Sequence, residues 1–361
     1  MFDRLTNLQS LRLSYNNFQR KLPSSLFALT QLSSLDCSKN EIEGPLPDKV
    51  AFLNLTQLSL QGNLLNGTIP QWALSLKSLR YLDLSNNRFT GHINEITSNS
   101  LEYLDLCNNE LQGNIPESIF DLVNLSNLCL SPHNWSDTVH FSLFSKLQKL
   151  SHLSLSGCNS LVLGSETSVN YTFSNLQALQ LRSNNIIGYS TFSGNFSELE
   201  FLELSNSKLE GKVPKWIHDN NLVNLTELCL SSDNHGGFVN FSLFSKFQNL
   251  SSLTLSGYES ISLKSDVNAN YTFSNLYMLR LFSNTILDFP KFSGKFHNKL
   301  QGKVPKWIHD LNSLYLMNLS TNQLTSIDHF SWHGLQYLDL SSNLMTDEIS
   351  FHPLQCFYSS I

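Results

Sequence analysis

Leucine recurs along most of the chain in one spacing, L-x-x-L-x-L-x-x-N, with polar or variable residues between the leucines. The unit begins again about every 24 residues, as from Leu8 to Leu32. Such a run is too short for a useful helical stripe, but in a strand its fourth and sixth residues point to one face and the residue between them to the other. The pattern therefore predicts a series of short strands that bury their leucines and expose the intervening positions.

The unit occurs fourteen times, and each copy is identified by its first leucine: Leu8, Leu32, Leu55, Leu79, Leu101, Leu125, Leu150, Leu176, Leu199, Leu225, Leu250, Leu276, Leu314 and Leu335. Its fourth position departs from leucine only at Met317 and its sixth only at Cys37. One such unit cannot bury its apolar face alone and must stack on its neighbours. The chain is thus predicted to be a leucine-rich-repeat solenoid, an α/β-type horseshoe or superhelix with a parallel inner β-sheet of about 14 coils and an irregular convex side.

The ninth position of the unit is asparagine in nine copies: Asn16, Asn40, Asn63, Asn87, Asn109, Asn184, Asn284, Asn322 and Asn343. A buried amide at the end of a strand must satisfy its donors and its acceptor on the backbone of adjacent coils. We therefore expect a ladder of asparagines. It is interrupted where other residues take the position: His133, Cys158, Ser207, Asp233 and Tyr258.

The second half of several repeats reads L-x-G-x-I-P or a close variant, as in 66–70, 112–116 and 210–214. Glycine permits the turn and proline stiffens the exit. With the irregular repeats near Asn134 and Asn234, this pattern resembles the plant extracellular class of leucine-rich repeats, as found in the ectodomains of plant receptor-like proteins and receptor-like kinases. The resemblance covers nearly the whole chain.

The resemblance implies a location at the extracellular side of the plasma membrane, a peptide or protein ligand, and a co-receptor chain in defence or developmental signalling. The chain itself shows no signal-peptide segment, no apolar run of 18 residues and none of the kinase motifs, so we expect no transmembrane or kinase domain and no direct membrane contact from these residues. It is expected to be non-enzymatic and to use no cofactor.

The chain is predicted to be a single leucine-rich-repeat domain over 1–361 that contains a tandem duplication of 124–219 and 224–310. Residues 124–186 and 224–286 align without a gap and share 36 identities in 63 positions. In the second copy one inner strand is missing after Phe296. Because the remaining sequence supplies little apolar surface to offset ordering entropy, a disordered bulge is predicted at 287–304.

The exposed strand positions are the expected ligand surface, and binding energy at such surfaces concentrates in Tyr, Trp and Arg. In the twelfth repeat, which belongs to the second duplicate, aromatic and basic residues occupy exposed strand positions that carry different residues in the first duplicate. The candidate ligand-binding residues are Tyr277, Met278, Arg280 and Phe282, the stacked Tyr81 and Tyr103, and the acidic pair Glu200 and Glu203. Drift of unconstrained surface positions explains the same differences.

Composition and chemistry exclude several other functions. Charged residues make up 14% of the chain and the formal net charge is -6, so no basic surface of the kind that nucleic acid requires is expected. Glu200 and Glu203 lie on an open face without a pocket that would raise a carboxyl pKa for hydrolysis. The 11 histidines show no metal-ligand spacing.

The six cysteines are expected to be mainly free thiols. Cys37 takes the place of a core leucine, and Cys158 that of an asparagine. Cys107 and Cys129 are assigned to exposed, diagonal positions of adjacent strands, which are usually too far apart for a disulfide.

N-glycosylation sequons point the other way, toward a secreted protein. There are eleven candidate acceptors: Asn54, Asn66, Asn124, Asn134, Asn170, Asn195, Asn224, Asn240, Asn249, Asn270 and Asn318.

The leading hypothesis is a non-catalytic recognition module, the ligand-binding portion of a plant receptor-like ectodomain. A soluble leucine-rich-repeat inhibitor of a secreted enzyme such as a cell-wall hydrolase is an alternative, and it would need no membrane segment. A degenerate gene product without function is another, suggested by the missing strand.

Overall fold

The computed structural model describes residues 2–131, 137–164, 171–187, 194–207, 213, 216–217, 222–231, 238–258, 260–262, 275–282, 286–287, 313–322, 324 and 334–345. They divide into two compact units, one built from 1–199 with 215–221 and the other from 200–214 with 222–361. The predicted bulge at 287–304 lies outside the described residues except for Leu287.

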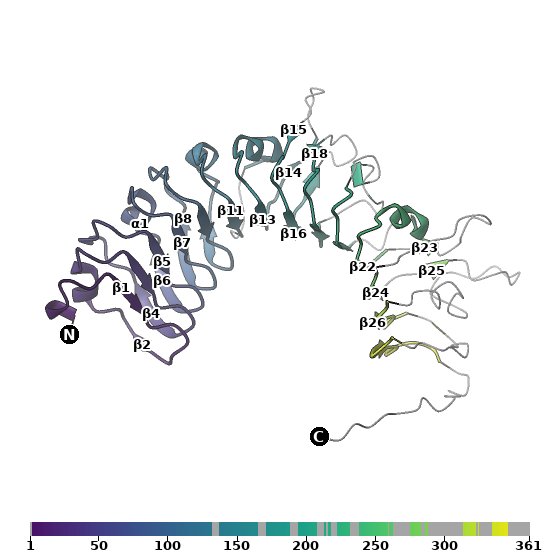
Figure 1. Cartoon of the computed structure of the whole chain (residues 1–361), viewed down its shortest axis with the longest axis horizontal. Helices are drawn as coiled ribbons and strands as arrows, with labels where there is room; N and C mark the ends of the chain where they lie inside the picture. Colours follow the sequence, from purple (N-terminus) through teal and green to yellow (C-terminus); the bar gives the residue numbers. More distant parts are fainter. Residues whose placement is uncertain are drawn as a thin grey trace, which may run out of the picture. The chain divides into compact units, whose positions relative to one another are not determined.

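Every one of the fourteen repeats forms the predicted strand, which confirms the fold class. In the first unit the strands pair in parallel in the order β1 (Ser10–Arg12), β3 (Ser34–Asp36), β5 (Gln57–Ser59), β7 (Tyr81–Asp83), β9 (Tyr103–Asp105), β11 (Asn127–Leu130), β13 (His152–Ser156) and β16 (Ala178–Arg182). In the second unit the order is β19 (Phe201–Ser205), β20 (Glu227–Ser231), β22 (Ser252–Ser256), β24 (Met278–Phe282), β26 (Leu316–Asn318) and β27 (Tyr337–Asp339). Figure 1 shows these strands along each unit.

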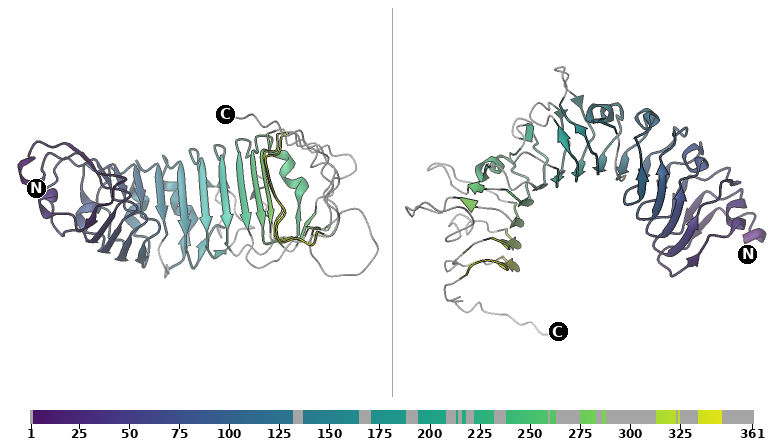
Figure 2. Two further views of the ribbon diagram at one scale, coloured as in Figure 1. Left: turned by 90° about the horizontal axis from the view of Figure 1, so that it is seen from below. Right: turned by 180° about the vertical axis from the view of Figure 1, so that it is seen from behind.

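Neighbouring strands pair without a register shift, so equivalent repeat positions lie side by side. Leu58 of β5 is opposite Leu35 of β3 and Leu82 of β7, and all three leucines are 0% exposed. The residues on either side of each central leucine form continuous rows on the other face of the sheet. Figure 2 shows the strands of the first unit that carry these rows lying side by side.

The glycine- and proline-containing halves of the repeats form a second parallel sheet in the first unit. Its strands pair in the order β10 (Glu110–Gln112), β8 (Arg88–His92), β6 (Leu64–Thr68), β4 (Glu41–Pro45) and β2 (Gln19–Arg20). Gly91 of β8 has a φ of +78°, and a Cβ atom built there would lie 2.9 Å from Cγ2 of Thr68 in the preceding coil. Glycine is required at this position both for the backbone conformation and for the close approach.

Shorter elements complete the coils. The remaining strands are β12 (Val139–His140), β14 (Leu161–Val162) and β17 (Ile186–Ile187), then β15 (Tyr171–Thr172) with β18 (Gly194–Asn195), and in the second unit β21 (Phe238–Asn240), β23 (Ser260–Ser262) and β25 (Ile286–Leu287). The helical turns are η1 (Phe2–Arg4), η2 (Ser24–Ala28), α1 (Gln71–Ser75), η3 (Glu117–Asp121), η4 (Phe141–Lys146) and η6 (Phe241–Lys246). Aromatic rings fill the core beneath some of these turns, as where Phe52 packs between Phe27 and Trp72 with ring centroids 5.9 Å from each.

The predicted asparagine ladder is confirmed at seven of its nine positions; the Asn16 amide donates within its own coil, and Asn284 lies outside the described residues. The Asn63 amide nitrogen donates to the carbonyl of Leu60 at 3.0 Å and to that of Cys37 in the preceding coil at 3.0 Å, and its Oδ1 accepts from the Ile42 N–H. Six further asparagines donate to a carbonyl of the preceding coil: Asn40, Asn87, Asn109, Asn184, Asn322 and Asn343. Each of these seven asparagines thereby ties its coil to the one before it.

A left-handed residue precedes the ladder position. Lys39 and Asn108, for example, have φ values of +53° and +55°. The chain turns sharply at this residue, and the following side chain points into the core. At three positions where asparagine is replaced the side chain is still buried: Cys158, Ser207 and Tyr258 are 2%, 0% and 1% exposed. His133 and Asp233 lie outside the described residues. Among the described residues, no helix is long and apolar enough to cross a bilayer.

Candidate functional site

Two tyrosines stack on the strand face of the first unit. Tyr81 of β7 is in register with Tyr103 of β9, and their rings lie 4.3 Å apart between centroids at 15° to each other. Both side chains are half-buried. Burial and the neighbouring aspartates raise the pKa of both phenols, so they stay neutral hydroxyl groups. The predicted stacking is confirmed.

Two aspartates follow the tyrosines on the same strands. Asp83 is in register with Asp105, and Asp83 is only 2% exposed. Burial raises the pKa of Asp83, with hydrogen bonds from Ser85 acting against it. Burial raises the pKa of Asp105 to about 6, and the charge of Asp83 adds to that effect. These two residues were not predicted as site residues, although aspartate at the fifth position of two successive repeats was a visible signal.

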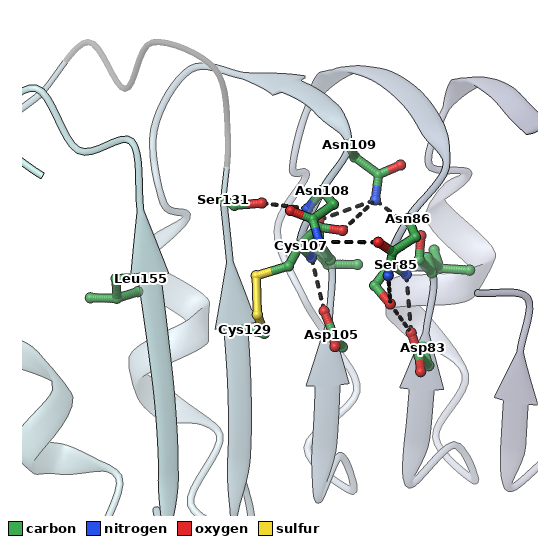
Figure 3. The surroundings of a disulfide bond; sticks show 12 residues. Asp83, Ser85, Asn86, Asp105, Cys107, Asn108, Asn109, Cys129, Ser131 and Leu155 are labelled. Atoms are coloured by element: carbon green, nitrogen blue, oxygen red, sulfur yellow. Dashed lines mark hydrogen bonds between the residues drawn. A yellow bond between two sulfur atoms is a disulfide. The ribbon is translucent and has the colours of Figure 1, made fainter. Parts of the chain in front are cut away.

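A disulfide between Cys107 and Cys129 closes one side of this cluster, with a Cα separation of 5.5 Å (Figure 3). The prediction that these two residues are free thiols on exposed, diagonal positions was wrong. The strand β9 ends at Asp105, whose Oδ1 accepts the Cys107 N–H at 2.9 Å, so Cys107 lies in the turn after the strand and is only 7% exposed. The diagonal separation of a regular ladder therefore does not apply. Cys37 and Cys158 are buried thiols, as expected.

The two cysteines of the disulfide also belong to a group of three potential metal ligands. Asp105, Cys107 and Cys129 bring a carboxylate oxygen and two sulfur atoms within 4.8 Å of one another. The two sulfurs are bonded to each other, and metal binding by cysteine needs thiolates. In its oxidised form this trio is therefore a crosslink beside a carboxylate.

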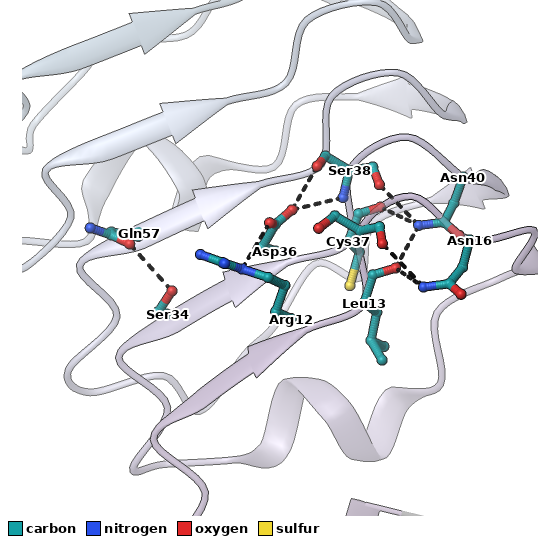
Figure 4. A network of polar contacts seen from close by, with 10 residues as sticks. Arg12, Leu13, Asn16, Ser34, Asp36, Cys37, Ser38, Asn40 and Gln57 are labelled. Carbon is teal, nitrogen blue, oxygen red and sulfur yellow. Dashed lines mark hydrogen bonds and ion pairs between the residues drawn. The ribbon is translucent and has the colours of Figure 1, made fainter.

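An ion pair occupies the same row of the sheet closer to the N-terminus. Arg12 of β1 is in register with Asp36 of β3, and its Nε lies 3.5 Å from Oδ2 of Asp36 (Figure 4). The other oxygen, Oδ1, accepts hydrogen bonds from the N–H and hydroxyl of Ser38. Burial pushes the pKa of Asp36 upward, but the bonds from Ser38 and the charge of Arg12 outweigh it and the pKa lies below its ordinary value.

The other aromatic candidates lie in the second unit. Tyr277 is 40% exposed, and Met278, Arg280 and Phe282 of β24 are half-buried on the same strand. The structure adds Tyr315, which directly precedes β26, and Tyr337 of β27, which were not predicted and whose rings lie 5.3 Å apart. The strand register places Tyr337 opposite Leu316 and not opposite Tyr315, so the two tyrosines are diagonal neighbours. The irregular spacing between their repeats hid this contact in the sequence.

The acidic pair Glu200 and Glu203 is not an exposed patch, and that part of the prediction was wrong. Glu200 is exposed, but Glu203 is only 9% exposed and its Oε1 accepts a hydrogen bond from the Ser205 hydroxyl at 2.8 Å. The side chains that precede and follow a central leucine are partly covered by the neighbouring strands, and Glu203 is one of these.

The sequons differ in accessibility. Asn54, Asn66, Asn195 and Asn249 are exposed, while Asn124, Asn224, Asn240 and Asn318 are half-buried. Asn134, Asn170 and Asn270 lie outside the described residues. Use of any of them stays a prediction.

The comparisons with known proteins agree with the repeat architecture. The Leucine Rich Repeat family matches residues 7–29, 54–76, 78–99 and 100–122. The chain is a leucine-rich-repeat protein. It is 32% identical to Receptor-like protein 41 of Arabidopsis thaliana over 98% of its own length and 44% of that protein, and 32% identical to Receptor like protein 24 of the same plant over 95% and 42%. The chain is thus similar to plant receptor-like proteins and spans less than half the length of these two.

Solved structures add a second line of similarity. The Arabidopsis receptor kinase HAESA, in complex with the peptide hormone IDA and the co-receptor SERK1, superposes with a TM-score of 0.67 at 26% identity over 94% of this chain and 59% of that one. The plant peptide hormone receptor RGFR1, in complex with RGF2, has a TM-score of 0.63 at 24% identity over 94% of this chain and 52% of that one, and it shows the shared fold alone.

Proposed function

We propose that this chain is part of the extracellular ligand-binding region of a plant cell-surface receptor-like protein, and that it binds a peptide or protein on the strand face of its repeats. The similarity to receptor-like proteins over 98% of the chain is the observation that carries the proposal. The complex of the related HAESA structure with a peptide hormone and a co-receptor supports peptide recognition and a second receptor chain as partners. Signalling then requires protein chains other than this one.

The chemistry of the strand face supports recognition. The stacked Tyr81 and Tyr103 offer aromatic surface at low conformational cost, and the half-buried Asp105 beside them offers a hydrogen-bond acceptor. The disulfide between Cys107 and Cys129 supports an oxidising compartment, in which such bonds persist. It thereby removes the conflict between an extracellular location and the expectation of free thiols.

A peptide-display experiment tests the proposal. The chain, secreted from plant cells so that its disulfide and glycans form, is immobilised and panned against a random peptide library. We expect peptides that bind the wild type and lose at least about tenfold in affinity, or about 1.4 kcal/mol, for the Tyr81→Ala/Tyr103→Ala variant.

Leu53→Ala is the matched control, because Leu53 is 68% exposed and lies outside the strands. Equal loss in both variants would contradict binding on the strand face. Recovery of no peptide, together with inhibition of a secreted cell-wall hydrolase by the same protein, would instead favour the inhibitor function.

A further inference from the structure

Two arginines of the first unit pair with an acidic residue on the next coil. Nε of Arg12 lies 3.5 Å from Oδ2 of Asp36, the in-register residue of the following strand. Arg80, which directly precedes β7, forms an ion pair with Glu102, which directly precedes β9. At both positions the chain itself supplies the carboxylate that faces the guanidinium group.

Arg280 of β24, in the second unit, occupies the same repeat position as Arg12, between the two inward leucines of the strand. Its in-register neighbours are Thr254 on the preceding strand and Asn318 on the following one, and both are uncharged. Within the part of the chain that the structure describes, the Arg280 side chain takes part in no ion pair and no hydrogen bond. The carboxylate that Arg12 has on the next strand is therefore missing here.

The polar side chains that follow Arg280 in the row are held by other partners. Oδ1 of Asn318 accepts the N–H of Ser320 at 2.8 Å, and its amide nitrogen donates to Oδ2 of Asp339 at 3.0 Å. Asp339 lies two strands beyond Arg280, roughly 10 Å away at the usual strand spacing. Its carboxylate is thus engaged by Asn318 and lies too far from Arg280 for an ion pair.

The guanidinium of Arg280 is accessible as well as unpaired. The residue is half-buried, and its nitrogens are not among the fully buried, unpartnered side-chain atoms of the described residues. Met278 and Phe282 lie on the same face of the strand, two residues before and after it. Apolar neighbours keep water away from part of the charge, which strengthens its attraction for an anion that covers it.

Exposed aromatic rings adjoin this position. Tyr277 directly precedes β24, and its carbonyl accepts the N–H of Tyr315, which directly precedes β26, at 2.8 Å. The two tyrosines are 40% and 38% exposed, and Tyr337 of β27 is 58% exposed. They provide aromatic surface for an apolar residue that lies beside the anion in a ligand.

We propose that Arg280 anchors a subsite for the side-chain carboxylate of an acidic residue in the ligand, with an apolar neighbour of that residue on Tyr277 and Tyr315. A guanidinium matches the geometry of a carboxylate and binds it through two parallel N–H···O bonds. The strand face continues on both sides of β24, over β22 and β26, so a ligand backbone can pass across Arg280 and present a side chain to it.

The positive charge belongs to the second duplicate alone. At the equivalent position the first duplicate has Gln180, on a strand of the same length and register, β16. That the ligand is a peptide or protein rests on the proposed function, whereas the carboxylate subsite itself does not.

The subsite is tested with N-acetyl-glutamyl-phenylalanine methylamide, by ligand-observed NMR titration of the folded, secreted chain at pH 7.5. The matching glutaminyl probe has nearly the same shape but no charge. We expect saturable binding of the glutamyl probe at least about tenfold tighter than that of the glutaminyl probe. Arg280→Gln, which introduces the residue of the first duplicate, should lose this preference. Arg12→Gln is the matched control and should keep it, because Arg12 is already paired with Asp36.

Two further readouts use the wild type and do not depend on the folding of a variant. Raising the NaCl concentration from about 20 mM to about 500 mM should weaken binding of the glutamyl probe and leave the glutaminyl probe unchanged. The glutaminyl probe with a free terminal carboxylate in place of the methylamide should bind more weakly than the glutamyl probe. If it bound as tightly, the assignment to an acidic side chain would be wrong.

Equal affinity for the glutamyl and glutaminyl probes, no saturation up to about 20 mM, or equal loss in Arg12→Gln would overturn the subsite. If the glutamyl probe binds as described and display recovers no peptide, the subsite stands and the proposed function fails. If display recovers peptides that depend on Tyr81 and Tyr103 while the two probes bind equally, the function stands and the subsite fails.

Discussion

Replacing the ladder asparagine Asn63 by alanine should open the solenoid locally. The side chain is 5% exposed and bridges two coils, because it accepts from the Ile42 N–H and donates to the Cys37 carbonyl. Its removal leaves the buried Ile42 N–H without this acceptor, whereas the Cys37 carbonyl still accepts the Asn40 amide at 3.1 Å. One buried backbone group without its partner costs about 1 to 3 kcal/mol, so Asn63→Ala should lower the local stability by about that amount.

Asn16 provides the matched comparison. It occupies the same repeat position, but it is exposed and its amide donates only to the nearby carbonyls of Leu13 and Ser14 at 3.1 Å. Asn16→Ala should cost no more than about 0.5 kcal/mol, as usual for an exposed site.

Amide hydrogen exchange resolved at the level of single repeats is the appropriate assay, since a repeat array need not unfold in one step. We expect faster exchange at Ile42 and in β3 and β5 for Asn63→Ala, with β13 unchanged. Similar exchange for the two alanine variants would refute the view that the inter-coil bonds of the asparagine stabilise the stack.

Three further predictions concern the first unit. The Cys107→Ser/Cys129→Ser variant lacks the disulfide, which closes a loop with a sequence separation of 22, and it should lose about 3 kcal/mol of unfolding free energy in urea. An unchanged midpoint of unfolding would show that the bond is absent or does not stabilise the fold. Gly91→Ala forces a Cβ against Thr68 and an unfavourable φ, so a loss of about 1 to 3 kcal/mol is expected in the same assay, and a gain would contradict the turn geometry. The pKa of Asp105 is raised in the folded state from 3.8 to about 6, so the folded chain holds the proton more tightly and its stability should fall as the pH rises from about 4 to 6; Asp105→Asn should flatten this slope, and an unchanged slope would assign it to other groups.

The repeating part of the fold was predictable because it depends on local, periodic information. Leucine at the fourth and sixth positions of each repeat leaves one way to bury the apolar face of the strand. The asparagine follows because the backbone groups of a buried turn need hydrogen-bond partners. The residues that replace asparagine, such as Tyr258, are buried for the same reason of position. Sequence spacing is enough for these features.

The candidate site was predictable only in part, since it depends on what lies across from a residue on the next coil. The stacking of Tyr81 and Tyr103 follows from strand register alone. The disulfide does not, because Cys107 has already left the strand and the turn brings it toward Cys129. The burial of Glu203 depends likewise on its neighbours, which the spacing of one strand cannot show.

Hydroxyl-radical footprinting of the chain with and without a display-selected peptide tests ligand binding on the strand face most directly. The account predicts that oxidation of Tyr81 and Tyr103 slows in the complex, while Tyr15, which is 80% exposed and lies beyond β1, reacts at an unchanged rate. Unchanged oxidation of Tyr81 and Tyr103, with protection of residues outside the strands such as Leu53, would contradict it.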